Sequence, residues 1–164
     1  MPKSKIIPFA PHHYSRLDAG NYRPVSIHCI LSKILELAVY VQIEDYLNKK
    51  KLFYANQSVF RKFYFTDTCL IDLTDNIRAN IANGNYVGMV LLDLQKAFDT
   101  VDHDILCRKL EAMGIDFTDR FKSYLTYRKQ VVIANDTMSE PQTVTCGVPQ
   151  GSILGPLLLS LIHI

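Results

Sequence analysis

Several features that mark common protein classes are missing from this sequence. No apolar stretch reaches the roughly 18 residues that a membrane-spanning helix requires, and the first residues, MPKSKIIPFAP, lack the apolar centre of a secretory signal. Internal repeats and low-complexity tracts are absent as well. What is present is an ordinary globular composition, 48% apolar and 21% charged, in a chain of 164 residues that is long enough for one domain. We therefore expect an intracellular protein, of the nucleus or cytoplasm, with no membrane partner.

Cysteine is scarce and widely spaced. The four cysteines, Cys29, Cys69, Cys107 and Cys146, never form a CxxC pair. This spacing favours free thiols in a reducing compartment over a disulfide framework.

The formal net charge of +2 conceals two halves of opposite sign. Residues 1–66 carry ten Lys and Arg against four acidic residues, whereas residues 67–164 carry eight against twelve. A basic half attracts phosphate-rich partners and an acidic half can gather metal ions. Two solvated surfaces without any partner would show the same balance, so both interpretations stay open.

The pattern of apolar residues predicts alternating helices and strands after an irregular, proline-punctuated segment at residues 1–26. Helices are expected at residues 27–47, 67–81, 102–113 and 119–128 and in ILGPLLLSLIHI. Strands are expected at residues 86–92 and in KQVVIAND and PQTVTC, with GVPQGS as a loop. This order predicts an α/β or α+β layer fold.

Four aspartates follow the most apolar of these strands. Asp93 ends the strand, where a charge is costly unless a cation or hydrogen bonds compensate it. Asp102 and Asp104 begin a predicted helix, so helix capping explains them. Asp99 fits either role, and a carboxylate at a strand end can also simply be solvated.

Five blocks of the sequence, in order, resemble the reverse transcriptases of non-LTR (LINE-type) retrotransposons. They are RLDAGNYRPVSIHCILSKILE, NQSVFRKFYFTDTCLIDLTDNI, LLDLQKAFDTVDHDIL, RFKSYLTYRKQ and CGVPQGSILGPLLLSLI, and together they span residues 16–164. Five blocks in the right order are far more specific than any one of them.

The resemblance implies an α+β fold, the fingers and a partial palm of a right-hand polymerase. Residues 1–84 would be mainly fingers and residues 85–164 mainly palm, within a single partial domain. The palm would be ferredoxin-like and lack its final hairpin. The implied activity is RNA-directed DNA polymerisation, with an RNA template, a DNA primer and deoxynucleotides as partners and Mg²⁺ or Mn²⁺ as the cofactor.

The resemblance also assigns roles to residues. Asp93 matches the first catalytic, metal-binding aspartate, and Leu94 the neighbour whose backbone carbonyl faces the metal. Lys96 and Ala97 would turn their amides toward the triphosphate. Phe98 matches the aromatic residue that excludes a 2′-hydroxyl and so selects deoxynucleotides.

Four further nucleotide-binding residues follow from the same resemblance. Gln150 and Gly151 match the loop beside the incoming nucleotide, where glycine permits a close backbone approach. Arg61 and Lys62 match the basic contact of the fingers to the triphosphate.

The sequence also departs from the family pattern. The family's aromatic–x–Asp–Asp hairpin is not found, so we expect a truncated domain that is inactive alone unless another chain supplies the missing half in trans. Phe63 and Phe65 stand where the family usually has glycine and serine. A non-catalytic nucleic-acid-binding remnant and a translated pseudogene product remain as alternatives.

Overall fold

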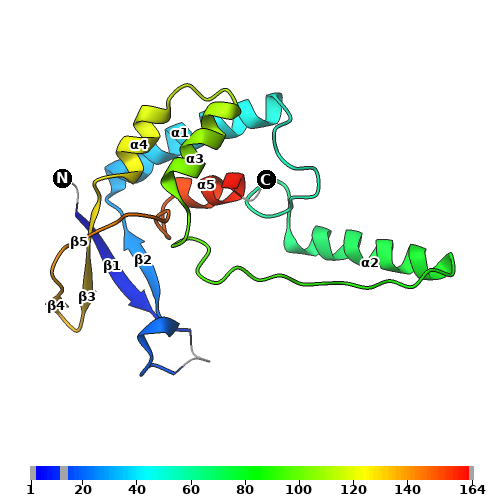
Figure 1. Cartoon of the computed structure of the whole chain (residues 1–164), viewed down its shortest axis with the longest axis horizontal. Helices are drawn as coiled ribbons and strands as arrows, with labels where there is room; N and C mark the ends of the chain where they lie inside the picture. Colours follow the sequence, from blue (N-terminus) through cyan, green and yellow to red (C-terminus); the bar gives the residue numbers. More distant parts are fainter. Residues whose placement is uncertain (1–2, 12–14, 163–164) are drawn as a thin grey trace. The chain divides into compact units, whose positions relative to one another are not determined.

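The chain forms two compact units in the computed structural model, which describes residues 3–11 and 15–162 (Figure 1). Unit 1 comprises Met1–Leu52 and Lys96–Ile164, and unit 2 comprises Phe53–Gln95. Over the described residues the architecture is mixed α+β, with five α-helices, one short 3₁₀ helix at Ala19–Asn21 and a five-stranded sheet.

The sheet belongs to unit 1 and is mixed. Its strands are β1 (Lys3–Phe9), β2 (Arg23–Ile27), β3 (Lys129–Ala134), β4 (Thr137–Met138) and β5 (Gln142–Thr143). β1 pairs with β2 in antiparallel and with β3 in parallel orientation, and β4 and β5 pair with different parts of β3. The two strands predicted in KQVVIAND and PQTVTC are confirmed, because β3 and β5 form there and pair with each other. Strand β5 is only two residues long.

The prediction that residues 1–26 are irregular is wrong. Strands β1 and β2 form there in a register that places Pro8 opposite Pro24. The pairing of β1 with β3 ends at Ile6, so Pro8 lies where β1 has only one partner strand and its missing N–H costs no bond to β3. Ile6, 3% exposed, anchors the strand in the core.

Four helices cover the rest of unit 1: α1 (Ile30–Lys49), α3 (His103–Ala112), α4 (Thr118–Leu125) and α5 (Leu154–Ile162). The apolar helix α5 contacts both α1 and α3, and α3 contacts α4. The largest fully buried side chains in the described part of the chain are leucines of these helices: Leu47, Leu106, Leu110, Leu125, Leu157, Leu158 and Leu161. In the part of the chain that the structure describes, no helix is long and apolar enough to cross a membrane.

The start of α3 follows a signal in the sequence. Asp102 caps α3, because its Oδ1 accepts a hydrogen bond from the amide of Ile105 at 2.9 Å. The predicted capping role of Asp102 is therefore confirmed, and Asp104 lies in the first turn of the same helix. All four cysteines are free thiols, as predicted.

Unit 2 holds α2 (Thr66–Ala82), which confirms the predicted helix, and a segment without secondary structure at residues 85–94. The strand predicted at residues 86–92 is wrong. Val90, Leu91 and Leu92 are 85%, 81% and 90% exposed, and none of the described strands pairs with this segment. An apolar run supplies the composition of a strand but not the partner whose backbone groups complete it.

Candidate functional site

Two loops of unit 1 that contain predicted site residues are joined by hydrogen bonds. One is the turn at residues 96–101 and the other is the loop at residues 146–151; we call them the paired loops. The amide of Val148 donates to the carbonyl of Phe98, and the amide of Gly147 donates to that of Val101, both at 2.7 Å. The structure therefore brings the segments of Phe98 and Gln150 together although about fifty residues separate them.

Gly147 makes this close approach possible. Its φ is +87°, and a Cβ atom there would lie 2.9 Å from the backbone of both Asp99 and Phe98. Any larger residue would be strained and would push the paired loops apart.

The other end of the loop at residues 146–151 is fixed to strand β2. The carbonyl of Gln150 accepts a hydrogen bond from the amide of Ser26 at 2.8 Å. A Cβ atom at Gly151, whose φ is +102°, would lie 2.8 Å from the Ser26 carbonyl oxygen. In the structure, the close backbone approach at Gly151 is made by strand β2.

Lys96, Ala97 and Phe98 form a tight turn. Lys96 is exposed with φ of +53°, and its carbonyl accepts a hydrogen bond from the amide of Asp99 at 2.8 Å. Ala97 and Phe98 are half-buried. The turn holds these three residues beside the backbone that carries Gln150.

A cavity of about 340 Å³ lies beside Gln150, and its lining includes Asp99, Cys146, Arg128 and Gln130. Burial raises the pKa of the Asp99 carboxyl, and the charge of Lys96 only partly opposes this effect. Burial lowers the pKa of Arg128, whose Nη2 donates to the Ser4 hydroxyl at 2.9 Å. The lining of the cavity is mixed, polar and apolar, with one acidic and one basic side chain.

The sequence analysis did not identify Arg128 as a site residue, and it left open whether Asp99 compensates a cation or caps a helix. Arg128 stands directly before a strand in YRKQ, within a recognised block, but a basic residue beside a strand is a common solvated feature. Its burial depends on contacts with Ser4 and with the ring of Tyr124, 5.4 Å away. Neither contact can be read from neighbouring residues.

Asp93 and Leu94 belong to unit 2 and are both exposed, in the segment where the predicted strand does not form. Among the described residues, no three His, Cys, Asp or Glu side chains gather as metal ligands would. Mg²⁺ takes six ligands in near-octahedral geometry. One carboxylate and one backbone carbonyl therefore do not fit a complete Mg²⁺ centre.

Arg61 and Lys62 also belong to unit 2. Arg61 donates hydrogen bonds to the carbonyls of Tyr54 and Gln57, each at 3.2 Å, and its guanidinium lies 4.1 Å from the centre of the Tyr64 ring. Lys62 is exposed and lies 5.2 Å from the centre of the Phe63 ring. Two of the five N–H donors of Arg61 are thus used within the unit.

The turn that follows Arg61 contains Phe63, one of the positions where the sequence departs from the family. Phe63 adopts φ of +68°, a left-handed conformation that costs a non-glycine residue roughly 1–2 kcal/mol. Glycine, the usual residue of the family at this position, would adopt it freely.

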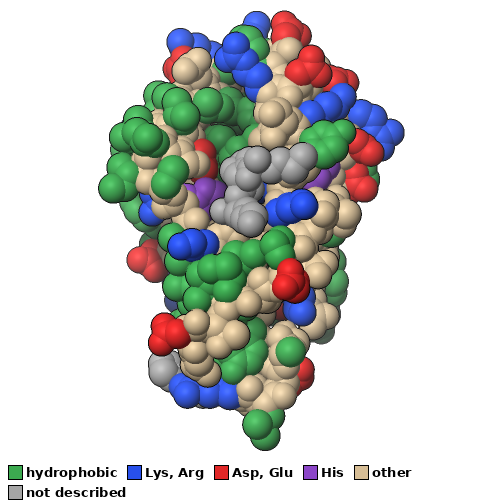
Figure 2. All heavy atoms as spheres, turned by 90° about the vertical axis from the view of Figure 1, so that its left-hand side faces the viewer, with side chains coloured by type: hydrophobic (Ala, Val, Ile, Leu, Met, Phe, Trp, Pro, Cys, Tyr) green, Lys and Arg blue, Asp and Glu red, His purple; other side chains and the backbone are tan. Residues whose placement is uncertain are grey.

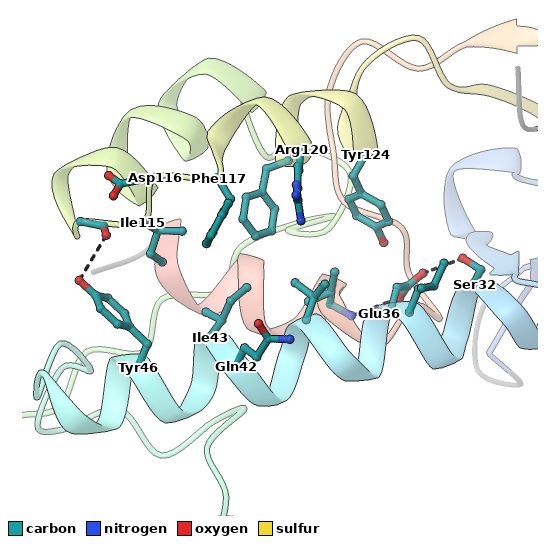
Figure 3. A pocket seen from close by; sticks show the side chains of 15 residues that line it. Ser32, Glu36, Gln42, Ile43, Tyr46, Ile115, Asp116, Phe117, Arg120 and Tyr124 are labelled. Atoms are coloured by element: carbon teal, nitrogen blue, oxygen red, sulfur yellow. Dashed lines mark hydrogen bonds between the residues drawn. The ribbon is translucent and has the colours of Figure 1, made fainter.

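A second cavity, of about 530 Å³, lies between α1 and α4 and contains none of the predicted site residues (Figure 3). Glu36 lies at its inner end, where its Oε2 accepts hydrogen bonds from the amides of Ile153 at 2.7 Å and Leu154 at 3.3 Å. Its Oε1 lies 3.2 Å from Nδ1 of His28. Burial alone would raise the pKa of Glu36, but the hydrogen bonds from His28 and the two amides outweigh it, so the pKa is lowered.

Tyr124 projects from α4 into the same cavity (Figure 3). Its hydroxyl oxygen is buried and has no hydrogen-bond partner among the described residues. Burial, the largest effect, raises the pKa of Tyr124 to about 12.

Known proteins match nearly the whole chain. The family model "Reverse transcriptase (RNA-dependent DNA polymerase)" matches residues 2–163. The chain is 34% identical over 142 residues to "Probable RNA-directed DNA polymerase from transposon BS" of Drosophila melanogaster, a match that covers 86% of this chain and 16% of the relative. It is 30% identical over 161 residues to "RNA-directed DNA polymerase from mobile element jockey" of Drosophila funebris, which covers 98% of this chain and 18% of the relative.

The chain therefore belongs to the reverse transcriptase family. It is homologous to the reverse transcriptases of non-LTR retrotransposons, as the sequence blocks predicted. It spans about a sixth of the length of the curated relatives that it matches.

Proposed function

We propose that this chain is the fingers and part of the palm of an RNA-directed DNA polymerase. In the whole enzyme it would help to add deoxynucleotides to a DNA primer on an RNA template. The observation that carries this proposal is the contact between the paired loops, which holds Phe98 beside the segment of Gln150. Those two residues are the ones that the family resemblance assigns to the sugar of the incoming nucleotide.

Specific roles follow for the remaining residues. Asp93, with the backbone carbonyl of Leu94, would bind Mg²⁺ or Mn²⁺, and the cation would neutralise charge on the triphosphate. Lys96, Ala97 and Gly151 would contact the nucleotide through their backbone, and Arg61 and Lys62 would contribute positive charge. Because the described residues do not assemble a complete metal site, the isolated chain would bind substrates without polymerising them.

Nucleotide binding tests the proposal directly. We expect dATP with Mg²⁺ to shift the amide NMR signals of Phe98, Gln150 and Gly151, and we expect Phe98→Ala to reduce the preference for dATP over ATP. Met138→Ala, at an exposed residue of strand β4 that belongs to neither loop and does not line the cavity beside Gln150, is the matched control. Absence of any shift at the paired loops would overturn the nucleotide-binding role.

Primer extension on an RNA template tests the proposed inactivity. We expect no extended primer with Mg²⁺ or Mn²⁺. Extension that Asp93→Ala abolishes would show that the isolated chain is active and would contradict this part of the proposal.

A non-catalytic nucleic-acid-binding role is favoured by one observation, the excess of Lys and Arg in residues 1–66. On the face shown in Figure 2, Lys and Arg side chains are spread among hydrophobic ones and do not form one basic patch. Retention on an RNA–DNA hybrid that weakens steeply with salt would support this role.

A further inference from the structure

His103 is a buried, chemically versatile side chain to which neither the family match nor the predicted site assigns a role. It is the first residue of α3 and is only 8% exposed. Its Nε2 lies 2.8 Å from the carbonyl oxygen of Gly147, in the loop at residues 146–151. The imidazole therefore joins α3 to the loop that carries Gln150.

The partner determines the tautomer. A carbonyl oxygen only accepts hydrogen bonds, so Nε2 of His103 must carry the proton for this bond to form. A buried carbonyl that loses its donor is left without compensation for its lost hydration.

With this bond, both backbone groups of Gly147 have fixed partners. Its amide donates to Val101 at 2.7 Å, and its carbonyl accepts from His103. Its neighbour Val148 donates to Phe98 at 2.7 Å. The peptide groups on either side of Gly147 are thus held in one orientation at the point where the loops meet.

The loop is held again three residues later, where the Gln150 carbonyl accepts from the Ser26 amide at 2.8 Å. Between these two attachments the chain has little freedom to shift. The separation between Gln150 and Phe98 then depends on whether the Gly147 end stays in place.

We propose that His103 is a positioning residue that fixes the loop at residues 146–151 against Phe98 and thereby sets the discrimination between deoxyribose and ribose. The second half of this inference rests on the proposed nucleotide-binding function. The first half, the fixing of the loop, does not.

Amide hydrogen exchange measured by NMR tests the first half. We expect His103→Phe, which keeps a ring but removes the donor, to speed exchange at Gly147 and Val148 at least tenfold and to leave α5 unchanged. His103→Gln, whose side-chain amide can donate to the same carbonyl, should restore most of the protection. In the wild type, the imidazole ¹⁵N signals should report a protonated Nε2.

A control separates positioning from general stability. Cys107→Ala removes another buried side chain of α3, and we expect it to change exchange through the helices without a selective effect on the loop. Unchanged exchange in His103→Phe, or an equal increase throughout unit 1, would overturn the positioning role.

Nucleotide titration tests the second half. We expect His103→Phe to keep binding dATP, but its preference for dATP over ATP should fall severalfold. His103→Gln should restore this preference. An unchanged preference would overturn the link to sugar discrimination. If the wild type binds neither nucleotide, the proposed function fails and the link to sugar discrimination fails with it, whereas the exchange experiment still decides whether His103 fixes the loop.

Discussion

At the scale of single residues, Gly147 is tightly constrained where the paired loops meet. Its positive φ and the 2.9 Å approach to Asp99 and Phe98 act together. We expect Gly147→Ala to lower the free energy of unfolding by about 1–3 kcal/mol, because the methyl group adds a steric clash to the cost of the left-handed conformation. Urea denaturation monitored by circular dichroism measures this loss.

Gly84 provides the matched control for that substitution. Its φ of +78° is similar, but a Cβ atom there would meet nothing within 4 Å. Gly84→Ala should therefore cost only the conformational term, about 1–2 kcal/mol and less than Gly147→Ala. Equal losses for the two variants would show that the contact between the paired loops contributes nothing.

The roles of site residues could be predicted from the sequence only where the residues belong to a recognisable motif. Phe98 and Gln150 stand in recognisable blocks, so their roles could be proposed from the sequence. His103 and Gly147 form their bond across more than forty residues, and a lone histidine carries no local signal of its partner. Glu36 was hidden for the same reason, since its partners Ile153 and Leu154 belong to a distant helix end.

At the scale of elements, the start of α5 depends on one carboxylate from α1. Glu36 accepts hydrogen bonds from two amides that would otherwise lack partners at this helix end. We expect Glu36→Gln to lower the free energy of unfolding by about 1–3 kcal/mol near neutral pH. Glu111→Gln, at an exposed carboxylate of α3, should change it little.

The stability that Glu36 contributes should also depend on pH. Because the pKa of Glu36 is lowered from its ordinary value of 4.5, its contribution is present above that value and is lost as the pH falls through the lower pKa of the folded state. The stabilities of wild type and Glu36→Gln should converge in acid. A difference that persists unchanged well below pH 4.5 would show that the ionised carboxylate is not the stabilising form.

Elements with local signals were predicted well and elements with distant partners were not. Helix α2 follows from its amphipathic pattern, α3 from a capping aspartate and a closing glycine, and α5 from a nearly continuous apolar run. Strand β1 was missed because one of its partners, β3, lies far along the chain and its prolines suggested an irregular segment. The strand predicted at residues 86–92 does not form, because an apolar run shows that the composition suits a strand but does not show that a partner strand is available.

At the scale of the whole molecule, the two units differ in how much they bury. Helix α2 has no buried residue, whereas most residues of α5 are buried. We expect the amides of α2 to exchange at least roughly a hundredfold faster than those of α5, because little burial opposes local opening. Hydrogen exchange read by mass spectrometry checks this, and limited proteolysis should cut first within residues 85–94.

Equal protection of α2 and α5 would contradict that expectation. It would mean that unit 2 is stabilised by contacts other than side-chain burial. A first cut inside α5 would contradict it equally.

The parallel pairing of Lys3 with Lys129 has a consequence for synthesis on the ribosome. Strand β1 can pair with β2 soon after both are synthesised, but its other edge must wait until β3 exists, and pairings of such long range form slowly. Until then one edge of β1 stays unpaired and Ile6 cannot be fully buried, so this part of the nascent chain is exposed to chaperones and to misassociation.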